Sequence, residues 1–323
     1  MDISEIEITA IRGIQIGHAQ DLNAATGCTV LIADHGVTAG VDVRGGAPGT
    51  RDTDLLNPVN LVEKIHGVVL TGGSAFGLDA CSGMMQYLEE QDLGFDTGVA
   101  KVPIVCGAVL FDLAIGDASI RPDKAMGYQA CLNATDKPCV QGNVGAGAGA
   151  TVGKILGMDR AMKAGLGACC LETQDLKVGA MVAVNCLGDV VNPATGELLA
   201  GVLSPDGTTI MSTEEIMIAD FVLRNIGFAS NTTIGIVVTN AVLTRSQATK
   251  VASMAHNGYA RTIRPTHTML DGDTLFTVAT GQVPADISVV GMLSARAVER
   301  AVIKAVQRAE RLLGFPCSNE VHP

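Results

Sequence analysis

The sequence N-T-T-I-G-I-V-V-T-N occupies residues 231–240 and marks the centre of the predicted core. The β-branched, apolar run from 233 to 239 predicts a buried strand, because such side chains pack well on a pleated surface. Thr232 then lies where this strand begins, directly after a connector of small residues, G-F-A-S, at 227–230. A flexible connector that meets a rigid strand at a threonine is the geometry that a self-cleaving nucleophile needs. An Asn-Thr pair taken alone indicates no more than the start of a strand.

A second segment downstream is expected to meet the first. Residues 244–247, T-R-S-Q, fit a capping box that opens a helix. The predicted apolar face of this helix consists of Ala248, Val251, Ala252, Ala255 and Tyr259. The sequence T-H-T-M-L-D-G-D-T-L-F follows at 266–276 and places Asp271 and Asp273 on either side of one glycine. With that glycine as a turn, both acids lie at the head of a second strand and are expected to converge on Thr232.

Together the two segments resemble the DmpA/NylC-type family of self-cleaving N-terminal-nucleophile aminopeptidases and amidases. Within that family the chain is most similar to the threonine-nucleophile branch that includes the nylon-oligomer hydrolases. The resemblance covers nearly the whole chain. It implies an α/β fold, a four-layer αββα sandwich formed by residues 1–323 as a single domain. It also implies cleavage into residues 1–231 and 232–323, which stay associated within a homo-oligomer, a tetramer of such heterodimers.

The resemblance also implies roles for residues of this chain. Thr232 would be the nucleophile, the bond after Asn231 would be the cleavage point, and the freed α-amine of Thr232 would be the general base. Asp271, Asp273 and Lys154 would orient that amine and tune its pKa.

Lys154 ends a glycine-rich run at 142–154, G-N-V-G-A-G-A-G-A-T-V-G-K. The run is not a P-loop, because Ala148 stands where the first glycine should be and Ile155 follows the lysine. A solvated lysine is the plain alternative. The family places a site lysine at the end of this segment, and this favours a functional Lys154.

Asn185 and Phe76 complete the candidate site. Asn185 lies near the end of an apolar strand predicted at 178–186, where its amide could donate to a developing oxyanion, as the family's asparagine does on the equivalent strand. Phe76 lies in the loop T-G-G-S-A-F-G at 71–77, between a short strand at 68–70 and a helix. The loop lacks the nucleotide-binding and nucleophile-elbow patterns. In the nylon-oligomer hydrolases that the chain resembles, an aromatic residue occupies the place of Phe76, and this resemblance implies that Phe76 forms part of the wall of a substrate site.

Composition excludes several other functions. The chain is 47% hydrophobic and 17% charged, which indicates a compact globular protein, and its net charge of −11 disfavours nucleic acid and anionic membranes as partners. The nine cysteines form no C-x-x-C pair and the six histidines show no metal-binding spacing. We therefore expect reduced core thiols and neither metal nor cofactor. No signal peptide or membrane-spanning run is visible, so the predicted location is the cytoplasm.

Three further helices are predicted from local signals. Asn57-Pro58 favours a helix start, with the helix ending at Gly67. A capping box at 212–215 predicts a helix with its apolar face at positions 216, 218, 219 and 222. The last helix is predicted at 292–313, followed by Gly314.

The sequence therefore favours amide hydrolysis through an acyl-Thr232 intermediate. Linear amides such as 6-aminohexanoate oligomers are the expected substrates. Alternatives within the family are an aminopeptidase or β-aminopeptidase and a D-amino-acid amidase or esterase. Acyl transfer of the ornithine acetyltransferase type and an uncleaved binding protein on the same scaffold are further alternatives.

Overall fold

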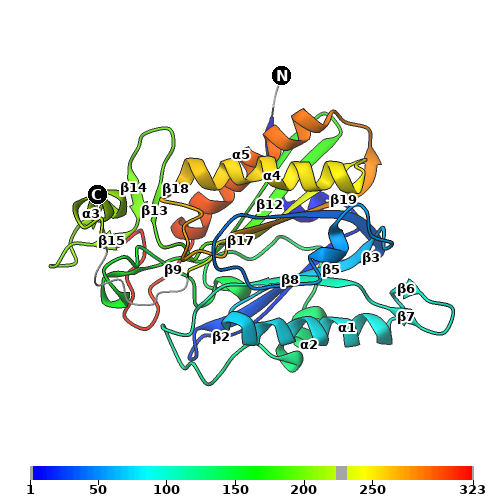
Figure 1. Cartoon of the computed structure of the whole chain (residues 1–323), viewed down its shortest axis with the longest axis horizontal. Coiled ribbons are helices and arrows are strands. Elements are labelled where there is room, and N and C mark those ends of the chain that lie inside the picture. Colours follow the sequence, from blue (N-terminus) through cyan, green and yellow to red (C-terminus); the bar gives the residue numbers. More distant parts are fainter. Residues whose placement is uncertain (1–2, 223–230, 322–323) are drawn as a thin grey trace.

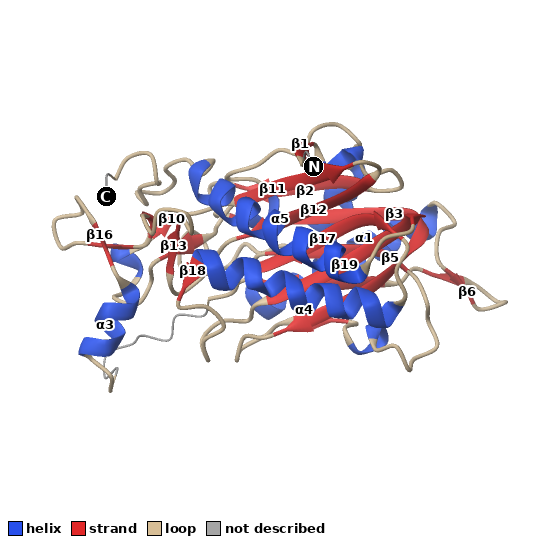
Figure 2. Ribbon diagram, turned by 90° about the horizontal axis from the view of Figure 1, so that it is seen from above, coloured by secondary structure: helices blue, strands red, loops and turns tan. Residues whose placement is uncertain are grey.

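The computed structural model describes residues 3–222 and 231–321. Two layers of strands lie between two layers of helices (Figure 1). The helices are α1 (Ala80–Glu90), α2 (Lys124–Leu132), α3 (Thr213–Ala219), α4 (Arg245–Thr262) and α5 (Ile287–Gln307). Helices α4 and α5 run side by side over one sheet layer (Figure 2), and α1 and α2 cover the other. This is the four-layer αββα sandwich that the sequence predicts.

One ten-stranded sheet forms both inner layers. Its order is β1-β11-β12-β17-β19-β3-β5-β8-β4, with β2 also paired to β3. The strands are β1 (Ser4–Ile6), β2 (Gln15–Asp21), β3 (Thr26–Val43), β4 (Thr50–Arg51), β5 (Ile65–Thr71), β8 (Val105–Val109), β11 (Leu166–Thr173), β12 (Leu176–Ala183), β17 (Ile234–Ala241) and β19 (Thr274–Val283). The 18-residue β3 pairs with β2 and β5 through its first half and with β19 through its second. Its register shifts between these halves, so the chain passes from one layer to the other within a single strand.

The remaining strands are short and lie outside this sheet. They are β6 (Phe95–Asp96), β7 (Lys101–Val102), β9 (Thr151–Val152), β10 (Met162–Lys163), β13 (Asp189–Val191), β14 (Leu198–Ala200), β15 (Val202–Leu203), β16 (Ile210–Met211) and β18 (Ile263–Arg264). With α3, the strands β13 to β16 form a separate lobe at one end of the sandwich (Figure 1).

The centre of the sandwich follows the sequence pattern. Strands β17 and β19 are parallel neighbours, with Ile234 beside Thr274, and α4 forms the crossover between them. Thr244 and Gln247 form the predicted capping box of α4, and the whole predicted apolar face of that helix is buried. Because parallel strands start at the same edge of a sheet, the residues just before β17 and β19 are brought together.

Three predicted helices differ from the structure, beginning with the one predicted after Asn57, which does not form. Residues 54–56 make a single 3-10 turn, Val59 is 86% exposed, and β5 begins at Ile65. The guanidinium of Arg245 takes up the carbonyls of Pro58 and Val62, so a tertiary contact replaces the helical hydrogen bonds.

The other two helices form with different ends or surfaces. Helix α5 begins at Ile287, capped by Asp286, and ends at Gln307, because Asn143 binds the backbone of Glu310 and fixes the chain beyond it. Helix α3 begins with its predicted Ser212 cap, but Ile218 on the predicted apolar face is 76% exposed. Its first residue is anchored to the body through Asp189, whereas its far end is not covered.

All nine cysteines are free thiols, and eight of them are buried. Within the described part of the chain, no helix combines the length and the apolar character required to cross a bilayer.

Candidate active site

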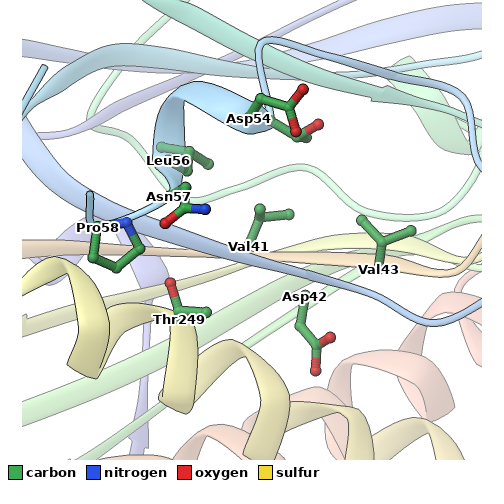
Figure 3. Close-up of a pocket in the computed structure, with 9 residues that line it drawn as sticks. Val41, Asp42, Val43, Asp54, Leu56, Asn57, Pro58 and Thr249 are labelled. Carbon is green, nitrogen blue, oxygen red and sulfur yellow. The ribbon is translucent and has the colours of Figure 1, made fainter. Parts of the chain in front are cut away.

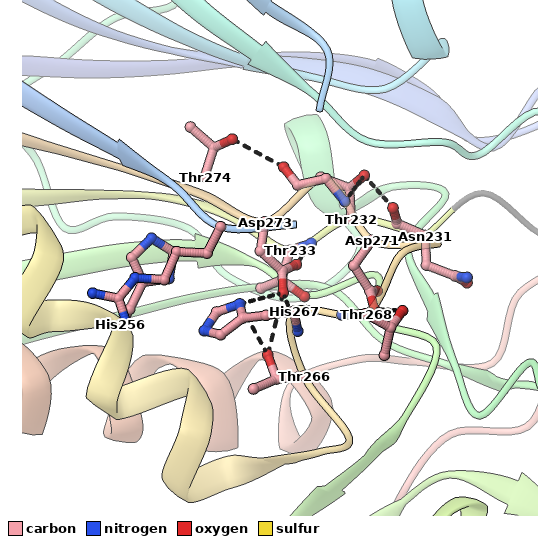
Figure 4. A network of polar contacts seen from close by, with 12 residues as sticks. Asn231, Thr232, Thr233, His256, Thr266, His267, Thr268, Asp271, Asp273 and Thr274 are labelled. Atoms are coloured by element: carbon pink, nitrogen blue, oxygen red, sulfur yellow. Dashed lines mark hydrogen bonds and ion pairs between the residues drawn. The ribbon is translucent and has the colours of Figure 1, made fainter. Parts of the chain in front are cut away.

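The starts of β17 and β19 are joined by backbone hydrogen bonds at the edge of the sheet (Figure 4). The N–H of Asn231 donates to Leu270 O at 3.0 Å, and the N–H of Gly272 donates to Asn231 O at 3.1 Å. Thr274 N–H donates to Thr233 O at 3.2 Å. The predicted convergence of the Asn-Thr and Asp-Gly-Asp segments is therefore confirmed.

Thr232 is buried at this junction, with 4% of its surface exposed. Its hydroxyl contacts the carbonyl oxygen of Asn231, the carbonyl that the hydroxyl would attack in self-cleavage. The N–H of Gly272 also lies 3.1 Å from Thr232 Oγ1, so one donor faces both oxygens. A Cβ at position 272 would lie 2.6 Å from Ala47 O and 2.7 Å from Thr232 Oγ1, which is why only glycine fits there.

Lys154 and Asn185 lie on the other side of Thr232. Thr232 N–H donates to the backbone carbonyl of Asn185 at 2.9 Å. Lys154 Nζ donates to that same carbonyl at 3.0 Å and to Asn185 Oδ1 at 2.9 Å. The backbone nitrogen of Thr232, which self-cleavage would convert into the α-amine, therefore shares one acceptor with the ammonium of Lys154. Lys154 follows β9 and is buried, so the alternative of a solvated lysine is wrong.

The side-chain amide of Asn185, two residues past β12, joins the two sheet layers. Its Oδ1 accepts from Thr151 N–H at 3.0 Å, and its Nδ2 donates to Phe111 O at 3.0 Å. Phe111 follows β8 and was not predicted as a site residue. The only sequence signal is its place at the end of the apolar run 104–110. One N–H of the Asn185 amide is thus used to hold the side chain in place.

The two carboxylates hold the backbone around Thr232 and not its nitrogen. Asp271 accepts from Leu187 N–H at 3.3 Å and from both the N–H and the hydroxyl of Thr268. Asp273 Oδ1 accepts from Thr233 N–H at 2.8 Å. Among the described residues, neither carboxylate is hydrogen-bonded to Thr232 itself. Their direct role in the structure is to fix the two strand starts.

Burial shifts the pKa values of two of these groups. Desolvation lowers the pKa of Lys154 to about 8, although the thiol of Cys186 and the carboxylate of Asp271 favour the charged form. Desolvation, with the nearby Asp273, raises the pKa of Asp271 to about 6. Near pH 8 a substantial fraction of Lys154 is therefore neutral, whereas Asp271 is ionised.

Phe76 lies apart from this cluster. Its ring, in the 3-10 segment Ser74–Asp79, is 59% exposed, and the guanidinium of Arg121 lies 3.9 Å from the ring centroid. The nearest link is indirect, through Gly73, whose N–H donates to Asp112 beside Phe111. The role of Phe76 in a substrate wall stays a prediction. The connector 227–230 lies outside the described residues.

A hollow of about 400 Å³ opens beside β3 (Figure 3). Its walls come from residues 41–43 of β3, from residues 53–58 and from Thr249 of α4. None of the candidate site residues lines it, so this hollow is separate from Thr232. Within residues 3–222 and 231–321, no cluster of three metal-ligating side chains occurs.

The fold and this junction define a class of protein. The structure superposes on a Burkholderia sp. β-aminopeptidase with a TM-score of 0.70 and 20% identity, covering 95% of this chain and 88% of that one. It also superposes on the L-aminopeptidase D-Ala-esterase/amidase of Ochrobactrum anthropi, described as a variant of the Ntn hydrolase fold, with a TM-score of 0.71 and 17% identity. That match covers 95% of this chain and 87% of the other. The protein therefore has the Ntn-hydrolase type of αββα sandwich.

Sequence comparison identifies the family to which the chain belongs. Residues 7–318 match the family described as peptidase family S58, and the chain belongs to that family. An uncharacterised aminopeptidase of Mycobacterium leprae is 41% identical, covering 96% of this chain and 92% of the relative. A 6-aminohexanoate-oligomer endohydrolase of Kocuria sp. is 32% identical, covering 84% and 74%. The protein is accordingly an amide hydrolase of family S58, as the sequence resemblance implies.

Proposed function

We propose that the chain cleaves itself before Thr232 and then hydrolyses amides through that residue. The observation that carries this proposal is the arrangement of Thr232 Oγ1 against the carbonyl of Asn231, with the N–H of Gly272 facing both oxygens. A threonine that only begins a strand has no need for this arrangement, in which one buried N–H faces both its hydroxyl oxygen and the carbonyl oxygen of the preceding residue.

Self-cleavage would proceed by acyl shift. Thr232 Oγ1 attacks the carbonyl carbon of Asn231, and the negative charge that develops on the carbonyl oxygen is stabilised by the N–H of Gly272. The C–N bond then breaks, the nitrogen of Thr232 leaves as an amine with the hydroxyl proton, and an ester joins Asn231 to Oγ1. Water hydrolyses this ester and releases residues 1–231 and 232–323 as associated chains.

Turnover would reuse the same oxygen. The freed amine of Thr232, beside the carbonyl of Asn185 and the ammonium of Lys154, accepts the proton of Oγ1 as the oxygen attacks a substrate amide. The second N–H of Asn185 Nδ2 stabilises the oxyanion, the protonated amine product leaves, and water hydrolyses the acyl-Thr232 ester. The positive charge of Lys154 favours the neutral, basic form of the α-amine.

The favoured substrates are linear amides with flexible apolar chains, such as 6-aminohexanoate oligomers, cut internally as well as at their ends. A strict aminopeptidase must bind a free substrate amine close to the cut, and a carboxylate is the usual partner for one. Asp271 and Asp273 are the acids nearest Thr232, and both already accept several hydrogen bonds from the protein. This favours the endohydrolase over the aminopeptidase that other relatives are named for.

We propose a cytoplasmic homo-oligomer, a tetramer of cleaved heterodimers. Exposed apolar side chains on and after α3, at Ile218 and Phe221, support an assembly that covers them. Multi-angle light scattering of the processed protein is expected to give about four times the chain mass of 33.2 kDa.

Intact-mass analysis tests the processing step. Purified protein should contain two chains, and sequencing of the smaller should begin Thr-Thr-Ile-Gly. Thr232→Ala should remain a single inactive chain, whereas Thr232→Ser should retain part of both activities. A fully active protein that stays intact would exclude the mechanism, and an inactive intact one would favour a binding protein.

Product analysis tests the substrate class. Incubation with 6-aminohexanoate oligomers, with and without a blocked amine, should release internal as well as terminal fragments. Release of single N-terminal residues alone, abolished by the block, would identify an aminopeptidase. Acyl transfer to an added amine in preference to water would instead identify a transferase.

A further inference from the structure

His267 contacts Asp273 from the side opposite Thr233 (Figure 4). Its Nδ1 lies 2.9 Å from Asp273 Oδ2, and its backbone N–H donates to the same oxygen at 3.0 Å. The hydroxyl of Thr266 also donates to Oδ2, at 3.2 Å. Because the carboxylate oxygen can only accept, Nδ1 must carry a proton.

The other oxygen of Asp273 is the one that faces the nucleophile strand. Oδ1 accepts from the N–H of Thr233 at 2.8 Å, in the peptide directly after Thr232. The carboxylate of Asp273 is 1% exposed, so it has no solvent to share these contacts. The orientation of the carboxylate therefore helps to fix the N–H of Thr233 just before β17.

The backbone of His267 has a left-handed conformation. Its φ is +58°, which is uncommon for residues other than glycine, although histidine adopts it more often than most. This conformation is what directs both the ring Nδ1 and the backbone N–H at one oxygen. Backbone strain of this kind persists where the surrounding structure over-determines it, commonly at functional sites.

The ring is also fixed from behind. It packs edge-on against His256, with ring centroids 4.9 Å apart, and lies 6.3 Å from the ring of Tyr259. His256 in turn binds the carbonyl of Asp42 through Nε2 at 2.9 Å. Packing thus leaves the imidazole little freedom to turn away from Asp273.

We infer that His267 is a positioning residue for the nucleophile: its Nδ1–H fixes the carboxylate of Asp273, which fixes the N–H of Thr233 and so the place of Thr232. This inference rests on the function proposed above. Misplacing a reacting group by about 1 Å costs up to about 100-fold in rate. Loss of the imidazole should therefore slow the chemical steps and leave substrate binding largely unchanged.

The test compares two replacements that both tolerate the left-handed backbone. His267→Gly removes the imidazole and keeps the backbone N–H, whereas His267→Asn restores a side-chain N–H near the position of Nδ1. We expect His267→Gly to lower both kcat and the rate of self-cleavage by about 10- to 100-fold, with KM changed less than about 3-fold. His267→Asn should recover most of that loss. His66→Gln, a buried histidine on β5 whose replacement can still accept from the N–H of Ile104, is the matched control and should change kcat by less than about 3-fold.

Two outcomes would overturn the inference. One is a His267→Gly protein that cleaves itself and turns over like the wild type. The other is a His267→Asn protein as slow as the glycine variant. That result would mean that the ring of His267 acts by packing and that its N–H donor is not what matters.

A spectroscopic measurement separates this inference from the proposed function. In full-length Thr232→Ala protein, nitrogen-edited NMR should show the Nδ1 proton of His267 as a downfield resonance that disappears on Asp273→Asn. A resonance that is absent, or that is unaffected by Asp273→Asn, overturns the inference whether or not the enzyme is active. If the resonance behaves as expected but wild-type protein neither cleaves nor hydrolyses, only the proposed function fails. The same measurement decides the case if His267→Gly does not fold.

Discussion

Lys154 and Lys163 are both buried, and they differ most in the groups to which they donate hydrogen bonds. Desolvation lowers the pKa of Lys154 to about 8 and that of Lys163 to about 7, and nearby carboxylates oppose both shifts. Lys163 Nζ donates to the carbonyls of Gly147 and Ala150, each at 3.0 Å, and to that of Ala164. All three of its protons are thus directed at backbone. Lys154 instead donates to the backbone and side-chain oxygens of Asn185, and the backbone oxygen also accepts a hydrogen bond from the N–H of Thr232.

This difference shows that burial and a displaced pKa do not by themselves identify a functional residue. Both lysines would be selected by a search for perturbed pKa values. Lys163 joins parts of the glycine-rich segment to one another, whereas Lys154 shares the carbonyl of Asn185 with the N–H of Thr232, the proposed nucleophile. This link to Thr232 through Asn185 distinguishes the two lysines, and the following predictions test whether it matters.

Lys154→Met should have the largest effect, on activity. We expect kcat to fall by about 1,000-fold, because both the positioning of Asn185 and the charge beside the α-amine are lost. The free energy of unfolding should change little, since removal of a buried charge offsets the lost hydrogen bonds. Steady-state kinetics and denaturant unfolding of the same preparation measure both. In the residual activity, the rising limb of the pH profile should shift to higher pH, because the α-amine loses a neighbouring positive charge. A lowered plateau with an unshifted limb would leave Lys154 only a positioning role.

Lys163→Met should show the reverse pattern. Three buried carbonyls lose one donor each, but those of Gly147 and Ala150 keep the N–H groups of Ala150 and Ala164, and removal of the buried charge offsets part of the loss. We therefore expect the free energy of unfolding to drop by about 1–3 kcal/mol, while kcat of the folded fraction stays within about 3-fold of the wild type. A loss of kcat as large as that of Lys154→Met, in protein of unchanged stability, would abolish the distinction.

The two lysines also show where sequence reasoning succeeds and where it stops. Strands β17 and β19 and the cap of α4 are set by local patterns, and local patterns can be detected in a sequence. Lys154 was identified because the family that the chain resembles places a site lysine at the end of this glycine run. Lys163, Phe111 and His267 carry no local signal, since each acquires its partner from a distant part of the chain.

The same limit explains the errors in the fold. A favourable Asn-Pro start at residue 57 is overridden by Arg245, which is far away in sequence and takes up the carbonyls that a helix would need. The far end of α3 looks apolar in sequence but is exposed in the single chain, and periodicity cannot distinguish a buried face from an uncovered one.

The pH dependence of stability gives a smaller but separable effect. A lysine whose folded pKa is lowered destabilises the fold increasingly as pH falls from its unfolded pKa of about 10.4 to its folded pKa, and by a constant amount below that. Between pH 7 and 8 the folded protein loses most of the remaining proton of Lys163, whereas Lys154, with a folded pKa of about 8, is still mostly protonated at pH 7 and about half protonated at pH 8. The difference in unfolding free energy between wild type and Lys163→Met should thus rise with pH in this interval, by up to about 1.4 kcal/mol per unit. The corresponding difference for Lys154→Met should rise only about a third as much there. Equal slopes for the two variants would show that the two environments are not distinct.

Phe76→Leu should have the smallest effect, because its ring is exposed and contacts Arg121 and none of the groups around Thr232 within the described residues. If a link to Thr232 is what matters, kcat should stay within about 2-fold of the wild type, well under 1 kcal/mol. KM for a long oligomeric amide is expected to rise by about 2- to 5-fold if the ring forms part of the substrate wall, since a leucine presents less apolar surface. KM for a short amide, which does not extend that far, should be unchanged, and the pair of substrates serves as the internal control. A fall in kcat of more than about 10-fold with both substrates would mean that a residue without a link to Thr232 governs the chemistry, and such a link would no longer explain why Lys154 and Lys163 differ.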